Sequence, residues 1–163
     1  GIFLFVAEPN IFSILVGFII SLLGEALRTW SSGYILKGKL LATEGPYSYI
    51  RHPLYFGSLI IGMGVCVMGG NLIFLFIFLV AFLAVYLHII EKEERNLMKR
   101  FGEEFLEYKA RVPRLFPRLS APTISKTGRQ FKWQLVFKHK EYNAWLGLLG
   151  ITGLLLLKHY LGL

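Results

Sequence analysis

Residues 72–90 constrain the fold of this chain most strongly, because they form a long apolar run without a single charged side chain. An α-helix rises about 1.5 Å per residue, so a run of this length matches the ~30 Å hydrocarbon core of a bilayer. The composition agrees, since 55% of the 163 residues are hydrophobic although the formal net charge is +8. Soluble domains seldom combine these two values, whereas integral membrane proteins often do. The run is therefore predicted to cross a membrane.

Other apolar stretches indicate further membrane helices. Residues 11–30 are long enough to span, and residues 54–68 are apolar up to a break at Gly69-Gly70-Asn71. That break carries no charge, so it predicts a tight hairpin. Residues 145–157 are apolar but short, which leaves a last span and a re-entrant or interfacial helix both open. Residues 2–7 are too short to span and suggest the end of a first span that has been trimmed.

A charged stretch after residue 90 carries a different pattern. Phe101, Phe105 and Tyr108 recur at i, i+4 and i+7, which predicts an amphipathic helix on the membrane surface. The expected fold is an all-α, polytopic integral membrane protein with about four to five membrane helices plus this cytoplasmic amphipathic helix. We expect a single membrane domain over residues 1–163, with N-terminal spans and a loop (1–53), a core (54–118) and a C-terminal linker, basic segment and hydrophobic helix (119–163).

The basic residues predict the orientation of these helices. Lys and Arg crowd residues 28–52 and 91–142 but are absent from the turns at residues 8–10 and 69–71. Cytoplasmic loops are enriched in Lys and Arg, so both basic stretches are predicted to face the cytoplasm. The positive balance then indicates topology and contact with anionic lipids, and nucleic-acid binding is not expected. The single Cys66 excludes an intrachain disulfide and a cysteine-based metal site.

The tripeptide Arg51-His52-Pro53 is the first candidate site. Proline suits the first turn of a helix, where its missing N–H costs nothing. A helix that begins at Pro53 would aim free N–H groups at the basic loop, which is typical of an anion site. An equally good interpretation of Arg51 is an anchor at the cytoplasmic interface, although this explains His52 poorly.

Small and acidic residues supply further candidates with competing interpretations. Gly57, Gly62 and Gly64 favour close helix packing over a groove for a ligand. Glu91 is spaced to pair with Arg95 at i,i+4. This leaves the following two glutamates to face a ligand or, more commonly for a charge run, solvent (Glu93, Glu94).

Arg28 is spaced to pair with Glu25 at i,i+3 near the end of a predicted span. The simpler interpretation is an ion pair that reaches water at the interface. The alternative is that Arg28 attracts a substrate anion.

Taken together in order, these motifs resemble the isoprenylcysteine carboxyl methyltransferase family and the related phospholipid N-methyltransferases. The resemblance covers roughly residues 22–118. It rests on GPYSYIRHPLYFG and EKEERNLMKRFGEEFLEYKARVPRLFP, and on Gly62 with Gly64 between them. Phe105 stands where tyrosine is common in the family, and the tail after Pro117 matches no family feature.

The resemblance implies an integral membrane enzyme with S-adenosylmethionine as its methyl donor, bound at the cytoplasmic edge. The cofactor-binding residues it implies are His52, Pro53, Tyr55, Gly57, Gly62, Gly64, Glu93, Glu94 and Tyr108. Arg28 and Arg51 are the candidates for holding an acceptor anion, and Glu91 or His88 would be the base for an amine acceptor. No metal is expected.

Several functions remain open. The favoured acceptor is a lipidic or prenylated molecule, most of all a carboxylate, with a phospholipid amine as the alternative. A membrane sterol reductase that uses NADPH has a similar Arg-His-x-x-Tyr-x-Gly stretch, but Pro53 and the run from Glu93 to Leu97 favour the methyltransferase. A non-catalytic membrane module is the last alternative. The partners expected are this substrate and membrane lipids, and the oligomeric state is open.

Overall fold

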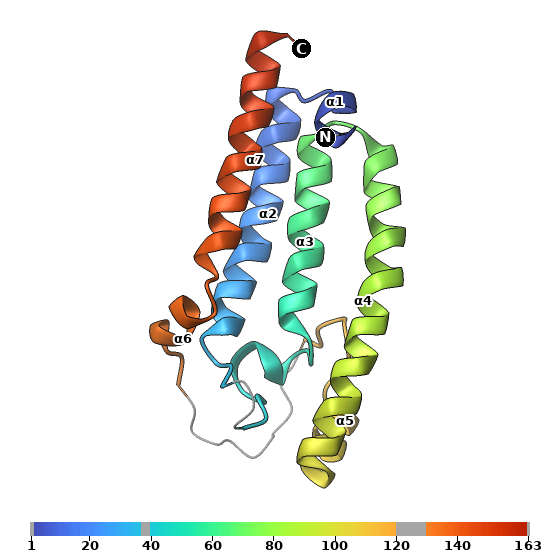
Figure 1. Cartoon of the computed structure of the whole chain (residues 1–163), viewed down its shortest axis with the longest axis vertical. Coiled ribbons are helices and arrows are strands. Elements are labelled where there is room, and N and C mark those ends of the chain that lie inside the picture. Colours follow the sequence, from blue (N-terminus) through green and yellow to red (C-terminus); the bar gives the residue numbers. More distant parts are fainter. Residues whose placement is uncertain (1, 37–39, 120–129, 163) are drawn as a thin grey trace. The chain divides into compact units, whose positions relative to one another are not determined.

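The structure, a computed structural model, describes residues 2–36, 40–119 and 130–162, and every regular element in these ranges is helical (Figure 1). The elements in chain order are α1 (Ile2–Val6), α2 (Ile11–Ser32), the short 3₁₀ helix η1 (Gly45–Ser48), α3 (Pro53–Met68), α4 (Leu72–Phe101), α5 (Glu103–Arg111), α6 (Trp133–Lys138) and α7 (Tyr142–Leu161). The all-α prediction is confirmed.

Local sequence sets where the long helices begin. At the start of α2, Ser13 N–H donates to Asn10 Oδ1 at 2.9 Å and Asn10 N–H donates to Ser13 Oγ at 3.1 Å. This reciprocal pair satisfies amides that a helix start leaves without partners. Helix α3 begins at Pro53, as predicted. Before α4, Gly70 takes a φ of +71°, which suits glycine because it lacks a Cβ, and this forms the predicted turn.

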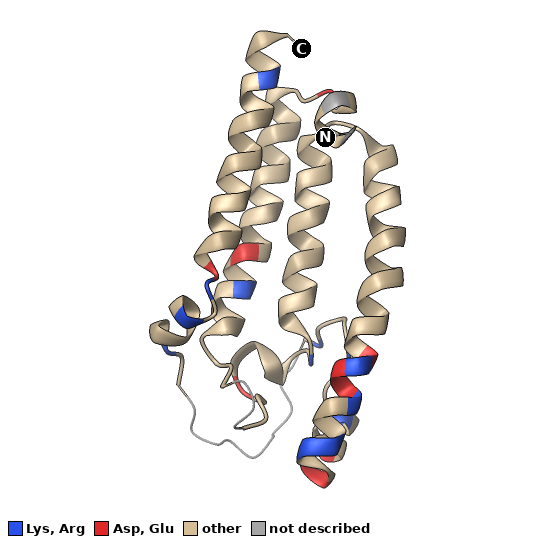
Figure 2. Ribbon diagram, in the orientation of Figure 1, with Lys and Arg blue, Asp and Glu red and all other residues tan. Residues whose placement is uncertain are grey.

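Three of these helices, α2, α4 and α7, are long and apolar enough to cross a membrane, and α3 is a shorter apolar helix of 16 residues. These helices confirm a polytopic integral membrane protein and meet the lower end of the expected number of spans. Helix α7 covers 20 residues, longer than the apolar core that suggested it, so its length suits a full span. Charged residues concentrate at the end of α4 and in α5 (Figure 2).

The chain forms two compact units, which we name the apolar unit (residues 1–26, 57–84 and 142–163) and the polar unit (residues 27–56 and 85–141). The apolar unit contains only three charged residues, Glu8, Glu25 and Lys158. Helices α2, α3 and α4 each run from one unit into the other by chain continuity.

The core of the apolar unit joins α2, α3 and α7. Its buried members are Ala7, Ile14, Met68, Leu148 and Leu155. On the remaining surface of α4, large apolar side chains stay exposed, for example Phe76 at 69%. Exposed apolar surface of this extent is costly in water but is what lipid tails contact in a membrane protein.

Glycines set the spacing of α2, α3 and α4 in this unit. A Cβ on Gly64 would overlap Ser21 and the carbonyl oxygen of Gly17 on α2, and a Cβ on Gly62 would overlap the Phe78 ring on α4. Ser21 Oγ also donates to the Ile61 carbonyl at 3.2 Å. Small residues therefore let the backbones approach closely, which is the packing interpretation that the sequence favoured.

In the polar unit, the amphipathic helix is α5, but the protein rather than the membrane covers its apolar face. Phe105 and Tyr108 are 1% and 4% exposed and pack with Leu41 and Val112. Periodicity alone predicts an apolar face and not what covers it. The predicted amphipathic helix is present and its apolar face packs within the polar unit, whereas its expected place on the membrane surface stays a prediction.

We expect Gly64→Ala to destabilise the fold, because the added methyl group has no room between α2 and α3. Overpacking of this kind costs about 1–3 kcal/mol, or ~2–10 °C in the unfolding midpoint. The measurement is thermal unfolding in detergent, followed with a thiol-reactive dye at the buried Cys66. Gly150→Ala in α7 is the control, since nothing lies within 4 Å of its added Cβ. Equal midpoints for the two variants would contradict this packing.

Candidate functional site

The carboxylate of Glu94 is the centre of a buried ionic cluster in the polar unit. Glu94 is 4% exposed and lies beyond the apolar part of α4. Its Oε1 accepts from Arg51 Nε at 3.0 Å and lies 3.2 Å from His52 Nε2, and its Oε2 accepts from Arg114 Nη2 at 2.9 Å. Lys109 Nζ lies 3.9 Å from Oε2. A buried carboxylate is costly unless it is paired in this way.

These contacts keep Glu94 ionised. Burial alone raises the pKa of a carboxyl group, but hydrogen bonds from His52 and Arg114 and the charges of Arg51 and Arg114 outweigh burial here. The net effect lowers the pKa of Glu94 from its ordinary value of 4.5 to about 2. Both oxygens already accept from the protein, so Glu94 acts as an anchor for cations.

Arg51 connects three segments of the polar unit. Besides Glu94, its Nη1 donates to the carbonyl oxygens of Lys109 at 2.9 Å and Val112 at 2.7 Å. Its backbone N–H donates to Pro113 O at 2.9 Å. The start of α3, the polar end of α4 and the end of α5 are therefore held together at one side chain. Because its donors are engaged in this way, Arg51 has a structural role that the sequence pattern did not predict.

Glu93, the neighbour of Glu94, faces a different environment. Its side chain is 45% exposed, and its Oε2 lies 3.6 Å from His52 Nδ1. Successive residues on a helix point about 100° apart, which explains why two adjacent acids differ so much. The His52 ring stacks on Tyr55, with ring centroids 5.8 Å apart, and Tyr55 meets Tyr86 edge-on at 5.3 Å. The His52 ring, whose two nitrogens contact the acids, therefore lies beside Tyr55, and Tyr86 packs on the Tyr55 ring.

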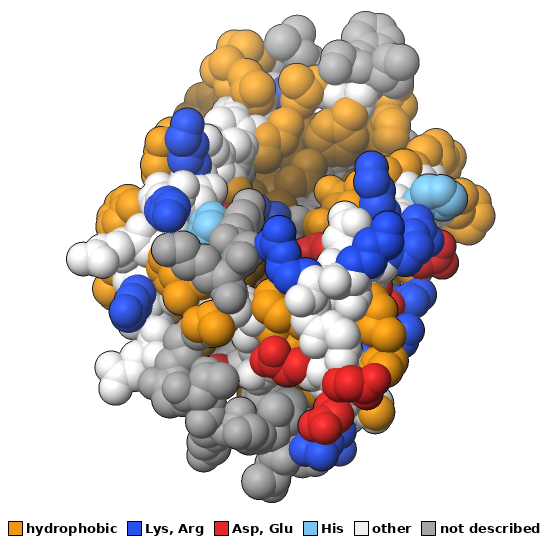
Figure 3. Space-filling model, turned by 60° about the horizontal axis from the view of Figure 1, so that its bottom comes forward, with side chains coloured by type: hydrophobic (Ala, Val, Ile, Leu, Met, Phe, Trp, Pro, Cys, Tyr) orange, Lys and Arg blue, Asp and Glu red, His pale blue; other side chains and the backbone are white. Residues whose placement is uncertain are grey.

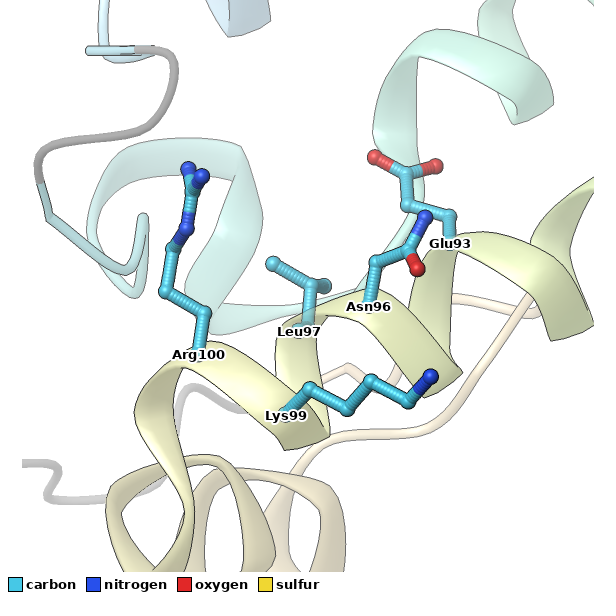
Figure 4. A pocket seen from close by; sticks show the side chains of 5 residues that line it. All are labelled: Glu93, Asn96, Leu97, Lys99 and Arg100. Atoms are coloured by element: carbon cyan, nitrogen blue, oxygen red, sulfur yellow. The ribbon is translucent and has the colours of Figure 1, made fainter.

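An open hollow of about 540 Å³ lies along this side of α4. Its lining side chains are Glu93, Asn96, Leu97, Lys99 and Arg100. Glu93, Asn96, Leu97 and Arg100 follow i, i+3, i+4 and i+7 and point to the same side of the helix in Figure 4, whereas Lys99 extends in another direction. The volume falls in the range of small-molecule sites, about 300–1,000 Å³. The face offers an acid, an amide, an apolar side chain and a cation.

Tyr108 has a packed position away from solvent. Its hydroxyl donates to the Tyr47 carbonyl oxygen at 2.7 Å. Burial raises the pKa of Tyr108, and the Glu94 charge raises it further although Arg51 opposes this. The phenol therefore stays neutral and holds η1 to α5, so contact with a cofactor remains only a prediction for this residue.

The remaining candidates lie in other settings. Arg28 Nη2 pairs with Glu141 Oε2 at 2.9 Å, and Glu91 is a surface residue 4.0 Å from Arg95 Nη1. Pro53 begins α3 in the polar unit, whereas Gly57, Gly62 and Gly64 belong to the apolar unit. Among the residues that the structure describes, no group of three or more His, Cys, Asp or Glu side chains is placed to hold a metal ion.

Sequence reasoning missed Arg114 and the face formed by Asn96 and Arg100. The helical spacing from Glu93 was available as a signal for the face, because i+3 and i+7 positions share one side of a helix. Arg114 gave no comparable signal, since it approaches Glu94 only through the fold of the segment after α5.

We expect Glu94→Gln to destabilise the protein far more than Glu93→Gln. Removing the Glu94 charge leaves Arg51 and Arg114 without their counterion, and breaking a buried pair costs about 3–5 kcal/mol. The unfolding midpoint in detergent at neutral pH should fall by roughly 10 °C. Glu93→Gln is the matched control, because its exposed position predicts a change of about 0.5 kcal/mol or less. Similar losses in both variants would contradict the anchor role.

The same variant provides a pH test. Because the folded pKa of Glu94 is lowered, its contribution to stability is present above the ordinary value of 4.5 and is lost as pH falls toward about 2. The stability difference between the native protein and Glu94→Gln should therefore shrink across this window. A stability difference between the two proteins that stays constant from pH 5 down to about pH 2 would contradict the role of ionised Glu94 as an anchor.

A cobalt-zinc-cadmium resistance protein of Cupriavidus metallidurans is 39% identical over 107 residues, which cover 62% of this chain and 49% of the relative. The protein-S-isoprenylcysteine O-methyltransferase of Schizosaccharomyces pombe is 33% identical over 81 residues, which cover 50% of this chain and 34% of the relative. The human enzyme of the same name is 39% identical over 77 residues, which cover 47% of this chain and 27% of the relative. No solved structure matches.

The chain thus spans between about a quarter and a half of the length of these relatives. The sequence profile described as phospholipid methyltransferase matches residues 11–104, which is more than half of the chain. This stretch includes α2, α3, α4 and the ionic cluster residues up to Glu94. The chain belongs to the phospholipid methyltransferase family.

Proposed function

We propose that the protein is an S-adenosylmethionine-dependent methyltransferase that modifies a lipidic or prenylated acceptor at the cytoplasmic edge of a membrane. The observation that carries this proposal is the hollow beside Glu93, because it opens on the polar end of α4, directly after the part of α4 suited to cross the membrane. Family membership and the relatives named as O-methyltransferases support it. The cytoplasmic placement follows from the Lys and Arg residues of the polar unit.

The chemistry of the hollow suits the cofactor. S-adenosylmethionine carries an ammonium, two ribose hydroxyls, a carboxylate and an aromatic base. Glu93 would accept from the ammonium or the hydroxyls, and Arg100 would bind the carboxylate as a charge-assisted pair. Asn96 offers both a donor and an acceptor, and Leu97 presents an apolar surface for the base. The aromatic rings of Tyr55 and Tyr86 would favour a sulfonium nearby.

In this arrangement His52 links the anchor to the ligand face. Glu94 holds Nε2 of His52, so that Nδ1 faces Glu93 and limits the positions its carboxylate adopts. Pre-organised side chains of this kind raise rates because they hold reacting atoms in line. Gly62 and Gly64 pack the helices within the apolar unit, and their contact with the cofactor stays a prediction.

The cofactor supplies an electrophilic methyl group. An acceptor carboxylate oxygen would form the new bond to the methyl carbon while the carbon–sulfur bond breaks and its electron pair stays on sulfur. No base is needed, because a carboxyl group with a pKa of about 4 is already ionised at neutral pH. An amine acceptor, with a pKa of about 10, must first lose a proton. Glu91, the candidate base for that case, is a surface residue that pairs with Arg95.

Arg28 and Arg51 act as anchors in this proposal. Arg51 is fully engaged by Glu94 and two carbonyl groups, and Arg28 pairs with Glu141.

The carboxylate acceptor is favoured over the phospholipid amine by the relatives named as isoprenylcysteine O-methyltransferases. No contact in the described residues specifically favours a reductase or a non-catalytic module.

The purified protein should bind S-adenosylhomocysteine in isothermal titration calorimetry. Glu93→Gln and Arg100→Gln should each weaken binding by roughly 10-fold to 100-fold, as expected when one charge-assisted hydrogen bond worth about 1.5–3 kcal/mol is lost. Arg95→Gln is the control, since Arg95 pairs with Glu91 and does not line the hollow. Tight NADPH binding without S-adenosylhomocysteine binding would replace this proposal with the reductase.

The acceptor class should be visible in the product. Membranes incubated with methyl-labelled S-adenosylmethionine should yield a lipid-soluble product that releases labelled methanol in mild base, because a methyl ester hydrolyses there and an N-methyl group does not. The rate should vary little between about pH 6.5 and 8.5 for a carboxylate, and rise with pH for an amine. A base-resistant product with a rising rate would establish the amine acceptor instead.

A further inference from the structure

We propose that residues 131–140, which include α6, form a surface that binds anionic lipids of the membrane to which the protein belongs. This inference does not depend on methyl transfer. We refer to these residues as the α6 segment. Part of it is fixed to the polar unit, and its exposed side chains include two aromatic and three basic ones.

The inner side of the α6 segment is fixed to the end of α2. Lys132 N–H donates to the Gly33 carbonyl at 3.0 Å, and His139 Nε2 lies 3.1 Å from the Ile35 carbonyl oxygen. The Phe131 ring occupies the space beside Gly33 where a Cβ would lie. At the end of the segment, the Arg28–Glu141 pair makes a further connection. The segment therefore has a defined orientation, with one face held inward.

The outer side presents apolar rings that the protein leaves uncovered. Trp133 and Phe137 are 62% and 65% exposed, whereas Leu135 and Val136 between them are 8% and 7% exposed. Trp133 and Phe137 are four positions apart and so share one face of α6. Large aromatic side chains that stay exposed side by side are typical of a surface that meets the membrane interface.

The exposed residues of the α6 segment are also basic. Lys132, Lys138 and Lys140 are exposed, and residues 131–140 contain no acidic side chain. The nearest acid in sequence, Glu141, is already paired with Arg28. The lysines are therefore not neutralised within the segment, and each basic residue near an anionic surface strengthens attraction to it by roughly fivefold. Figure 3 shows exposed basic and hydrophobic side chains next to one another on the molecule.

Chain continuity places the segment at the membrane. Helix α7, long and apolar enough to cross, begins at Tyr142, and α2, which is also long enough, ends at Ser32 beside the contact with Gly33. A segment joined to both helix ends must lie at the headgroup level if these helices span. Interfacial helices that prefer anionic lipids place aromatic rings at the edge of the acyl chains and lysines among the lipid phosphates, and the α6 segment offers both kinds of side chain.

The test uses tryptophan fluorescence of the full chain in lipid nanodiscs. The variant Trp30→Phe/Trp145→Phe leaves Trp133 as the single tryptophan, because the chain has three. Brominated phosphatidylglycerol or brominated phosphatidylcholine is included at the same low mole fraction in unbrominated phosphatidylcholine. Bromine quenches only a nearby indole, so the ratio of the two quenching values reports lipid enrichment at Trp133.

We expect the brominated anionic lipid to quench Trp133 at least twice as strongly as the brominated zwitterionic lipid. Adding Lys132→Gln, Lys138→Gln and Lys140→Gln should bring the ratio close to one. The matched control removes three exposed cations of α4 with Lys92→Gln, Arg95→Gln and Lys99→Gln and should keep the preference. Far-UV circular dichroism confirms that each variant is folded.

Three results would overturn the proposal. Equal quenching by both lipids would make Trp133 an ordinary interfacial residue without headgroup preference. Absence of quenching by either lipid would show that the α6 segment does not meet the membrane. A preference that survives removal of the three lysines would assign it to basic residues outside the segment.

Discussion

The ionic contacts of one buried carboxylate, Glu94, organise the polar unit of this protein. Burying a charge in a protein costs several kcal/mol unless other groups replace the lost water. Here Arg51 and His52, from the start of α3, and Arg114, from the segment after α5, supply that replacement. The start of α3, the polar end of α4 and the segment after α5 can satisfy this carboxylate only together. Their relative positions in the unit are thus coupled through a single side chain.

This anchor gives two adjacent acids separate roles. Glu94 points inward, where its oxygens already accept from the protein, whereas Glu93 points to the hollow along α4. His52 contacts both acids through its two ring nitrogens, so the inner cluster also restricts the outer carboxylate. A polar cofactor would therefore meet a carboxylate, Glu93, that the buried His52 restrains, at the end of a helix whose apolar part is suited to lipid.

The sequence predicts the local features of this fold well. The apolar runs, the charge-free turn at Gly70 and the proline start of α3 each follow from the properties of a few neighbouring residues, and the structure contains them. Features that depend on distant contacts were not predictable in the same way. Arg28 pairs with Glu141, more than a hundred positions away, and the covering of α5 comes from Leu41 and Val112. Helical periodicity identifies an apolar face but not the surface that covers it.

The division between Glu93 and Glu94 illustrates the same limit for the site. Both acids fit a ligand-binding motif, and only the position of Arg51 and Arg114 in space distinguishes the anchor from the exposed residue. The glycines of α3 are a related case, because Gly62 and Gly64 fit a ligand groove by sequence but contact Phe78 and Ser21 in the structure. Packing glycines and binding glycines share the same requirement for close approach.

Hydrogen–deuterium exchange measured with and without S-adenosylhomocysteine tests the central claim most directly, because it locates the ligand on the chain without any substitution. The account predicts slower exchange in peptides that cover the polar end of α4 around Glu93 to Arg100 and the start of α3 around His52, with little change in α7. Protection confined to α7, or no protection at a ligand concentration that saturates binding, would contradict the assignment of the cofactor to this face of α4.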